Sequence, residues 1–476
     1  MKLLLVNPPE TRTLRSNLPG PIESLRGKNP PIGLLYAAAA ARTVESWAVE
    51  LIDAHAMDWN ADDIASEAVR IKPDLVGVTA TTFTYLDALD VARAAKRGRP
   101  DCLVVFGGVH PFIYPAETLA QPEVDMIIAG EAEQSLPALL RFWAEGGPPA
   151  SASGRVPGLL VKGDDTAGFV PAPVIDDLDS VPAPAWDMSP VDRYYSLISG
   201  LNPVTILLSS RGCPFRCRYC ALSPTGKRWR PHSAERVVEE MKICRGLGAR
   251  YLLFYDELFT VRRKRVVEIC DLIRKDGVGV PWMARATPDM VDADMLSLMR
   301  GAGCDMITFG VEAGNPKVLE NLGRKPTIVE ARAAFEAASK AGLRTIAYFM
   351  LGNPGEGRAE IDDSLSLAKS LEPDYVHASI FMPYPASDAY AESLASGKIK
   401  NDYWREFAAR PGPDFEPPYW NEKFTDRELE TQLLRFYRGF AFRPSFILKR
   451  LMRMRSAGEL AKAFRAALKL LLGFGG

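Results

Sequence analysis

Three cysteines stand close together in the stretch SSRGCPFRCRYCAL (209–222): Cys213, Cys217 and Cys220. Thiolates at this spacing suit either zinc or an iron–sulfur cluster. A structural zinc site needs a fourth Cys or His, and His232 is the local candidate. A cubane cluster held by three thiolates instead leaves one iron open to atoms of a substrate or cofactor. The spacing therefore favours a cluster with an open iron.

The other cysteines lie in apolar stretches and are expected in the protein core: Cys102, Cys244, Cys270 and Cys304. An odd total of 7 cysteines without a paired framework is typical of a reducing compartment. The first residues, MKLLLVNPPETR, lack the apolar core of a signal peptide, and the chain has no uninterrupted apolar run of the roughly 18 residues that a membrane span needs. We therefore expect a cytoplasmic protein.

The composition predicts a protein of several domains. The chain has 476 residues, of which 47% are hydrophobic, and this is enough for more than one packed core. Its formal net charge of -1 gives no overall attraction to nucleic acid or to an anionic surface. We expect no nucleic-acid partner.

The first 145 residues alternate between short apolar runs and stretches with helical spacing. The expected strands lie within 2–9, 48–54, 75–82, 103–110 and 126–133. This pattern predicts a Rossmann-like, doubly wound parallel sheet, whose ligands bind beyond the carboxyl ends of the strands. The residues expected at that rim are Asn7, Thr79, Thr81, Thr82, Gly107, Gly108, Gly130 and Glu131.

A second alternating region follows a segment rich in Pro and Gly. Residues 146–198 are expected to be a linker with a small hairpin, and residues 199–395 a partial (β/α)6 barrel of the TIM type. The expected barrel strands lie within 204–212, 250–256, 280–288, 305–314, 344–355 and 374–387. The three cysteines follow the first of them, at the rim where such barrels carry their active sites. Residues 396–476 are expected to be mostly helical.

The cysteine motif resembles the signature of the radical S-adenosylmethionine (SAM) enzymes, C-x3-C-x2-C with an aromatic residue, here Tyr219, before the last Cys. In that family the open iron of a [4Fe-4S] cluster chelates SAM, and an electron from the cluster cleaves SAM to a 5'-deoxyadenosyl radical. The resemblance implies that Tyr219 lies at the SAM site. It also implies an external electron donor.

The ends of the later barrel strands carry the same resemblance. Asp256 and Glu257 in FYDELFT are similar to an acidic stretch that binds the SAM amino group, where a carboxylate accepts charge-assisted hydrogen bonds. Arg285 in MARATPDM is also expected at the SAM site, where its guanidinium could pair with a carboxylate. The motifs TFGVEAGN and YFMLGNPGEG are similar to family motifs near SAM, and they contribute Glu312, Gly352 and Gly355.

The N-terminal region resembles the cobalamin-binding domain of the cobalamin-dependent radical SAM family, in VNPP, LVGVTATTFTYLDALDVARAAK and VVFGGVHPFIYPAETL. The loop after the first strand lacks the D-x-H-x-x-G motif that supplies a cobalt ligand, and His55 and His110 are expected to be polar rim residues rather than ligands. The resemblance extends to the class B methylases and to the anaerobic magnesium-protoporphyrin monomethyl ester cyclase. It implies methylation of an unactivated carbon of a small or lipid-like substrate. The alternatives are radical oxidative cyclisation or rearrangement and, in another class, a non-catalytic cobalamin or metal-binding sensor.

The end of the chain is basic and amphipathic. Leu460, Phe464, Leu468 and Leu471 recur at helical spacing opposite much of the positive charge of 449–469. This pattern is typical of an interfacial helix and suggests peripheral contact with a membrane that carries a lipid-like substrate. The alternative is a helix docked on the barrel with a solvated basic face. Aromatic residues in 401–420 are expected to cap the mouth of the active site or simply to pack.

Overall fold

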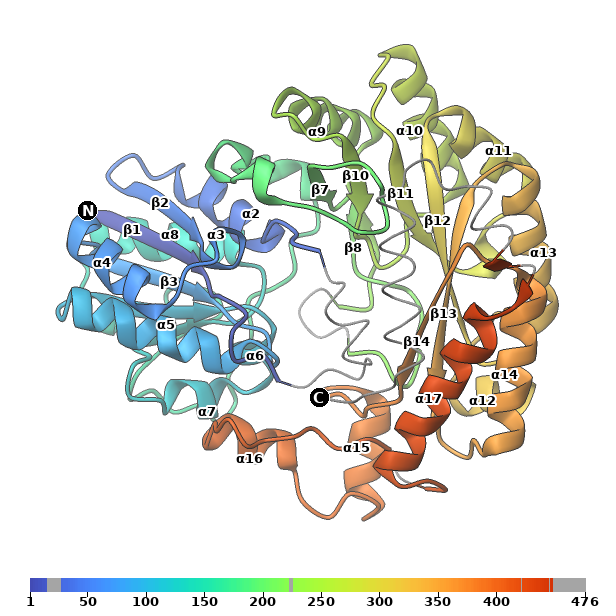
Figure 1. Ribbon diagram of the computed structural model, residues 1–476. Coiled ribbons are helices and arrows are strands. Elements are labelled where there is room, and N and C mark those ends of the chain that lie inside the picture. Colours follow the sequence, from blue (N-terminus) through green and yellow to red (C-terminus); the bar gives the residue numbers. More distant parts are fainter. Residues whose placement is uncertain (15–26, 222–225, 421, 445, 448–476) are drawn as a thin grey trace.

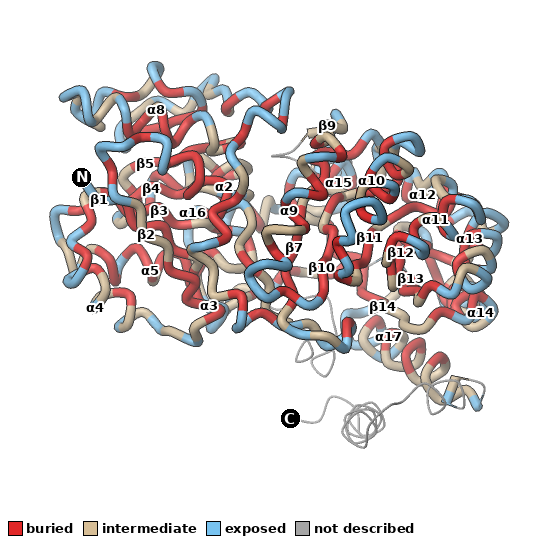
Figure 2. Tube along the Cα trace, turned by 90° about the horizontal axis from the view of Figure 1, so that it is seen from above, coloured by how far each residue is buried: buried red, intermediate tan, exposed pale blue. Residues whose placement is uncertain are grey.

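The structure is a computed structural model, and it describes residues 1–14, 27–221, 226–420, 422–444 and 446–447. Two sheets lie on opposite sides of a ring-shaped molecule, and the segment that contains α15 (Asp388–Ala395) and α16 (Tyr403–Ala409) runs between them (Figure 1). Buried residues line both sheets, as the view from above shows (Figure 2).

The first sheet has the strand order β2-β1-β3-β4-β5-β6. Its strands are β1 (Lys2–Asn7), β2 (Ala48–Asp53), β3 (Leu75–Thr79), β4 (Leu103–Gly107), β5 (Met126–Ile128) and β6 (Leu159–Val161). All neighbours are parallel except β5 and β6, which are antiparallel. The five predicted strands are confirmed, and the segment expected to be a linker adds an edge strand to the same sheet.

Helices cover both faces of this sheet, because side chains along each strand alternate between two cores. Leu4 and Val6 of β1 join one core, and Leu3 and Leu5 join the other. The helices of this unit are α2 (Ile32–Ala41), α3 (Ala54–Met57), α4 (Ala61–Ile71), α5 (Tyr85–Gly98), α6 (Val109–Ile113), α7 (Pro115–Leu119) and α8 (Ala132–Ala144). Short 3-10 turns follow at 149–151, 178–180, 186–188 and 191–193.

The second sheet consists of six parallel strands in the order β14-β13-β12-β11-β10-β7. They are β7 (Val204–Leu207), β10 (Tyr251–Phe254), β11 (Trp282–Ala286), β12 (Cys304–Glu312), β13 (Arg344–Leu351) and β14 (Tyr375–Ile380). The helices are α9 (Ala234–Gly246), α10 (Arg263–Lys275), α11 (Ala293–Gly301), α12 (Pro316–Asn321), α13 (Ile328–Lys340) and α14 (Arg358–Leu371), with a 3-10 turn at 288–290. The six predicted strands and the partial barrel are confirmed. A small antiparallel pair, β8 (Ser210–Arg211) and β9 (Arg230–Pro231), flanks the cysteine loop.

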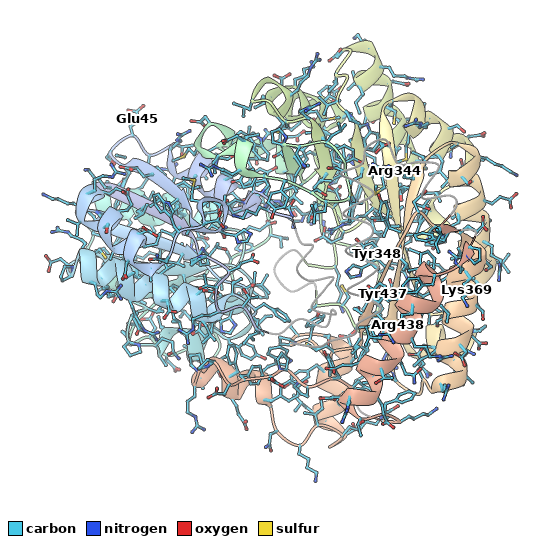
Figure 3. All side chains as sticks on the ribbon, in the orientation of Figure 1. Glu45, Arg344, Tyr348, Lys369, Tyr437 and Arg438 are labelled. Carbon is cyan, nitrogen blue, oxygen red and sulfur yellow. The ribbon has the colours of Figure 1, made fainter. Side chains whose placement is uncertain are left out.

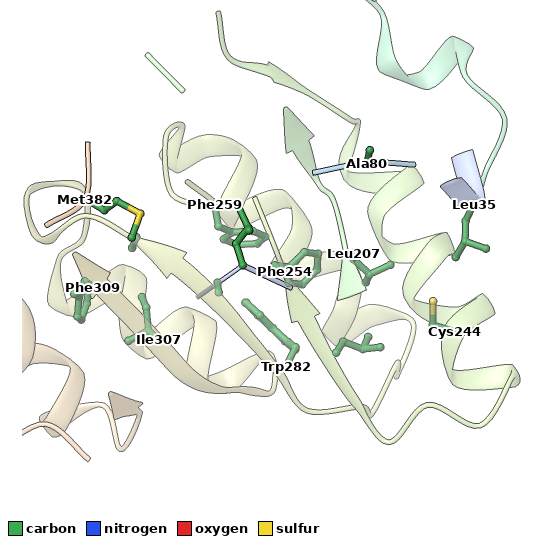
Figure 4. Packing of buried hydrophobic residues seen from close by; sticks show 14 of the residues in the cluster. Leu35, Ala80, Leu207, Cys244, Phe254, Phe259, Trp282, Ile307, Phe309 and Met382 are labelled. Atoms are coloured by element: carbon green, nitrogen blue, oxygen red, sulfur yellow. The ribbon is translucent and has the colours of Figure 1, made fainter. Parts of the chain in front are cut away.

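The core between the barrel strands and their outer helices includes a cluster of aromatic rings. Phe254 and Trp282 meet edge to face with centroids 5.5 Å apart, and Phe259 lies 4.9 Å from Phe254 (Figure 4). Tyr251 and Leu253, which alternate with Leu252 and Phe254, point instead into a separate cluster. The strands of the barrel are therefore buried on both faces.

The C-terminal part is helical as far as it is described. The helix α17 (Asp426–Ala441) packs on β14 and α14, and the Tyr437 hydroxyl donates to the carbonyl of Ala378 and accepts from its N–H. The expected basic helix at 449–469 lies outside the described residues. Within the described ranges, no helix has both the length and the apolar character to cross a membrane.

Candidate active site

The carboxyl ends of the two sheets meet at two places. Glu131, just beyond β5, forms an ion pair with Arg211, just beyond β7, at 3.1 Å. On the other side, the ring of Phe83, beyond β3, lies 5.9 Å from that of Tyr384, beyond β14. Because ligands of parallel α/β sheets bind beyond the strand ends, both candidate binding rims face the same region.

The cysteine loop begins at Gly212, which no other residue could replace without strain. Its φ is +83°, and a Cβ there would clash with the Arg228 carbonyl oxygen. Cys213 is buried, and Cys217 and Cys220 are partly exposed. Burial, followed by the neighbouring thiols Cys217 and Cys213, raises the pKa of Cys220 to about 12.

The three thiols fit the predicted cluster. They influence one another's ionisation, and as thiolates they would need nearby positive charge, which the irons of a cluster supply. Within the part of the chain that the structure describes, no three His, Cys, Asp or Glu side chains are arranged to hold a single metal ion. A cubane uses one thiolate for each of three irons, so its ligands are spread around the cluster.

His232 does not complete a zinc site. It is 2% exposed, its Nδ1 lies 2.9 Å from an Asp179 carboxylate oxygen, and its Nε2 lies 3.3 Å from the Tyr36 hydroxyl. Both ring nitrogens are therefore engaged by protein groups. The cysteines outside the loop are buried, as predicted: Cys102, Cys244, Cys270 and Cys304.

Asp256 faces the protein rather than a ligand. Its carboxylate accepts from the Ser209 N–H at 2.7 Å and from the hydroxyls of Ser209 and Ser210 at 2.5 and 2.6 Å, and it is fully buried. Asp256 thus fixes the end of β7 just before the cysteine loop, which is a positioning role. The neighbouring acid Glu257 contributes to the raised pKa of the Cys213 and Cys220 thiols, and Glu312 also contributes to that of Cys220.

Glu312 ends β12 in a left-handed conformation with φ +70° and is 9% exposed. Burial raises the pKa of Glu312, whereas Arg324 and a hydrogen bond with Tyr219 lower it. The structure therefore brings together two predicted residues, Tyr219 and Glu312, with Arg324, which the sequence reasoning missed. Arg285, at the end of β11, lies 4.1 Å from the ring centroid of Tyr255.

The two glycines after β13 have partners within the protein. Gly352 has φ +76°, and a Cβ there would lie 2.6 Å from Leu429 of α17. Gly355 has φ +76°, and its N–H donates to Glu422 at 2.6 Å. Their small size serves the turn and the packing of the C-terminal segment.

Several residues of the first rim are also engaged by the protein. Asn7 donates to Asp53 at 2.7 Å. Gly108 has φ +101°, and a Cβ there would lie 2.7 Å from the Ala80 carbonyl oxygen. Gly130 has φ +120° and packs on Ala172. Glu131 accepts from Arg211, Arg230 and the Ile175 N–H, so its carboxylate is used between the two sheets. The exposed members of the predicted set include Thr81.

The two histidines of the first unit lie apart from each other. His110 is completely buried, stacked on Tyr85 with centroids 3.7 Å apart and 3.2 Å from the Thr82 hydroxyl. Burial lowers its pKa to about 3. It belongs to the core rather than to the rim where it was expected. His55 lies in α3 and is partly exposed.

The barrel strands also carry a layer of polar aromatic residues that the sequence reasoning missed. The aromatic rings of Tyr348, on β13, and His377, on β14, have centroids 4.8 Å apart. Figure 3 shows Tyr348 pointing from β13 towards the centre of the molecule. Burial raises the pKa of Tyr348, and Arg285 opposes this. Tyr348 and His377 each stand between apolar residues on their strands. This alternation could have indicated from the sequence that both face the inside of the barrel.

The sequence matches the family model of the radical SAM superfamily over residues 207–368 and that of the B12 binding domain over residues 20–140. Fold and site thus define a radical SAM barrel preceded by a cobalamin-binding domain. The chain is 32% identical over 456 residues to an uncharacterized methyltransferase of Pyrococcus horikoshii, and the match covers 94% of each chain. The chain belongs to the cobalamin-dependent radical SAM family. This confirms the predicted class of enzyme and its cofactors: a [4Fe-4S] cluster, SAM and cobalamin.

Other similar proteins agree with this family. The anaerobic magnesium-protoporphyrin IX monomethyl ester cyclase of Rubrivivax gelatinosus is 27% identical, over 89% of this chain and 76% of its own. The solved structure of the cobalamin-dependent SAM radical enzyme OxsB superposes with a TM-score of 0.73 at 17% identity, covering 98% of this chain and 70% of its own. The radical SAM methyltransferase TsrM of Kitasatospora setae gives a TM-score of 0.66 at 19% identity, covering 84% and 75%. These two structures support the fold.

Proposed function

We propose that this protein is a methyltransferase that places a methyl group on an unactivated carbon of a small-molecule substrate. The observation that carries the proposal is the meeting of the two rims, at the Glu131–Arg211 ion pair and the Phe83–Tyr384 contact. These two contacts would keep the rim that we expect to bind cobalamin opposite the cysteine loop. When bound, the cluster would supply the electron that cleaves SAM, and cobalamin would carry the methyl group.

The residues that the chain would contribute follow from their positions. Cys213, Cys217 and Cys220 would hold the cluster, and Glu257 beside them would bind the SAM ammonium. Thr79, Thr81 and Gly107 would contact cobalamin together with the backbone of the remaining rim positions. Arg285 would pair with the SAM carboxylate, and Tyr348 and His377 would line the substrate side of the barrel.

Cyclisation is the second candidate, favoured by the 27% identity to the cyclase over most of both chains.

An anaerobic incubation of cluster-reconstituted protein with SAM, hydroxocobalamin and titanium(III) citrate distinguishes methylation from cyclisation. We expect both 5'-deoxyadenosine and S-adenosylhomocysteine, with Cys217→Ala as the control that forms no deoxyadenosine. Deoxyadenosine without S-adenosylhomocysteine would favour cyclisation. Absence of both products, in protein that contains full iron and sulfide, would refute the proposed chemistry.

A further inference from the structure

The turn that follows α12 is docked against the cysteine loop. The Arg218 N–H donates to the Leu322 carbonyl at 3.1 Å, and the Arg218 guanidinium donates to the Asn321 carbonyl at 3.0 Å. The Lys325 ammonium lies 5.8 Å from the ring centroid of Phe215. The turn therefore has a defined position relative to the cysteines.

Arg324, in this turn, points its guanidinium at a thiol of the loop. Its Nη1 lies 3.9 Å from the Cys217 Sγ, and its Nη2 donates to the Gly310 carbonyl at 2.7 Å. The side chain is 5% exposed, and the nearest carboxylate, that of Glu312, lies 3.9 Å away. The absence of a side chain at Gly310 provides the room, because a Cβ there would lie 2.9 Å from Nη2.

We propose that Arg324 raises the reduction potential of the cluster held by Cys213, Cys217 and Cys220, an inference that rests on the proposed cluster site. When an external one-electron reductant reduces [4Fe-4S]2+ to [4Fe-4S]+, the cluster and its thiolates gain one negative charge. A fixed positive charge beside a ligating sulfur stabilises that reduced state, and hydrogen bonds to sulfur act in the same direction. Burial of the guanidinium strengthens the effect, because little water screens it.

Without Arg324, the buried carboxylate of Glu312 would remain beside the cysteine loop and would lose the guanidinium that lies 3.9 Å from it. The reduced cluster would then be disfavoured both by the missing cation and by the remaining acid. Arg324 is therefore a positioning and tuning residue that acts through a cluster ligand. A merely structural role would change cluster content or stability and leave the midpoint potential of assembled clusters unaltered.

The test is a redox titration of the anaerobically reconstituted full chain without SAM, followed by electron paramagnetic resonance. For Arg324→Gln, at the wild-type midpoint potential, we expect the ratio of reduced to oxidised cluster to fall about tenfold, a shift of about 59 mV for a one-electron couple. Arg324→Lys should give an intermediate midpoint, because it keeps the charge but loses the forked contacts. The control is Arg332→Gln, which removes an exposed arginine on α13 that bonds to Ser370, and it should not shift the midpoint.

The outcomes separate this inference from the proposed function. An unchanged midpoint in Arg324→Gln with full iron and sulfide would overturn the role of Arg324 and leave the cluster in place. A wild-type protein without a [4Fe-4S] signal would overturn the cluster site itself. If Arg324→Gln does not hold a full cluster, Arg324→Lys decides: a midpoint below wild type supports the inference, and one equal to or above wild type contradicts it.

Discussion

The ion network between the two sheets predicts a large cost for a small change, Glu131→Gln. Glu131 is 7% exposed, and its oxygens accept from Arg211 at 3.1 Å, from Arg230 at 2.8 and 2.9 Å and from the Ile175 N–H at 2.6 Å. Glutamine has nearly the same shape but turns one acceptor into a donor that faces other donors. It also leaves buried arginines without their full counter-charge. Removal of one partner of a buried pair costs about 3–5 kcal/mol of unfolding free energy.

The assay is urea unfolding of the cofactor-free protein, with Glu50→Gln as the matched control. Glu50 pairs with Arg70 on the surface at 3.2 Å, where such pairs contribute about 0–1 kcal/mol. Burial would raise the pKa of Glu131, yet bonds from Arg230 and Ile175 hold it below the ordinary value. This stabilisation is present above pH 4.5, the ordinary value, and is lost as pH falls through the lower folded-state pKa. A Glu131→Gln protein no less stable than Glu50→Gln at neutral pH would refute the reasoning.

Other positions give contrasting results. Glu257→Ala should weaken SAM binding about 10- to 100-fold in equilibrium dialysis, because it removes a charge-assisted hydrogen bond. The iron content should stay at the wild-type level. An unchanged SAM affinity would exclude Glu257 from the site. Asp256→Asn should lower the free energy of urea unfolding by about 1–3 kcal/mol, because the amide leaves a buried hydroxyl of Ser209 or Ser210 without its acceptor. It should leave the SAM affinity of the folded protein within about twofold. The reverse pattern would contradict its positioning role. Burial raises the pKa of Glu356 to about 7. The free energy of unfolding should therefore decline by up to ~3 kcal/mol as pH rises from 4.5 to 7, and Glu356→Gln should remove this pH dependence. An unaltered pH dependence would assign it to other groups. A basic interfacial helix at 449–469 predicts that the protein co-sediments with anionic vesicles. The double variant Arg453→Gln, Arg465→Gln should reduce the sedimented fraction several-fold. No sedimentation of the wild-type protein would favour the docked helix.

The fold could be predicted from the sequence because its strands are buried on both faces. Most of them read as apolar runs ended by Gly, Pro, Thr, Asn or Asp, and each of the eleven predicted runs overlaps a strand of the structure. The short edge strand β6 was missed as part of the first sheet, because only three apolar residues, LLV, mark it. Its pairing with β5 is a tertiary contact.

The site was predicted less completely, because a motif gives the position of a residue and not the direction of its side chain. Asp256 and Glu257 are adjacent, and in the structure the first is turned into the protein and the second lies near the cysteines. Arg324 was missed because the residues between it and Cys217 include four strands. The contact between them arises only when α12 docks on the cysteine loop.

The joint at Arg211 couples the position of the first unit to the cysteine loop. Arg211 is separated from Cys213 only by Gly212, whose left-handed conformation admits no side chain. Arg211 is held by Glu131 and Glu133 from the first unit, and its guanidinium lies 4.7 Å from the ring centroid of Tyr36 on α2. A displacement of the cobalamin-binding rim therefore has to move the start of the cysteine loop or break buried ion pairs. The distance between the two rims is thus set next to the residues that would hold the cluster, where radical transfer and methyl delivery both require it to be constant.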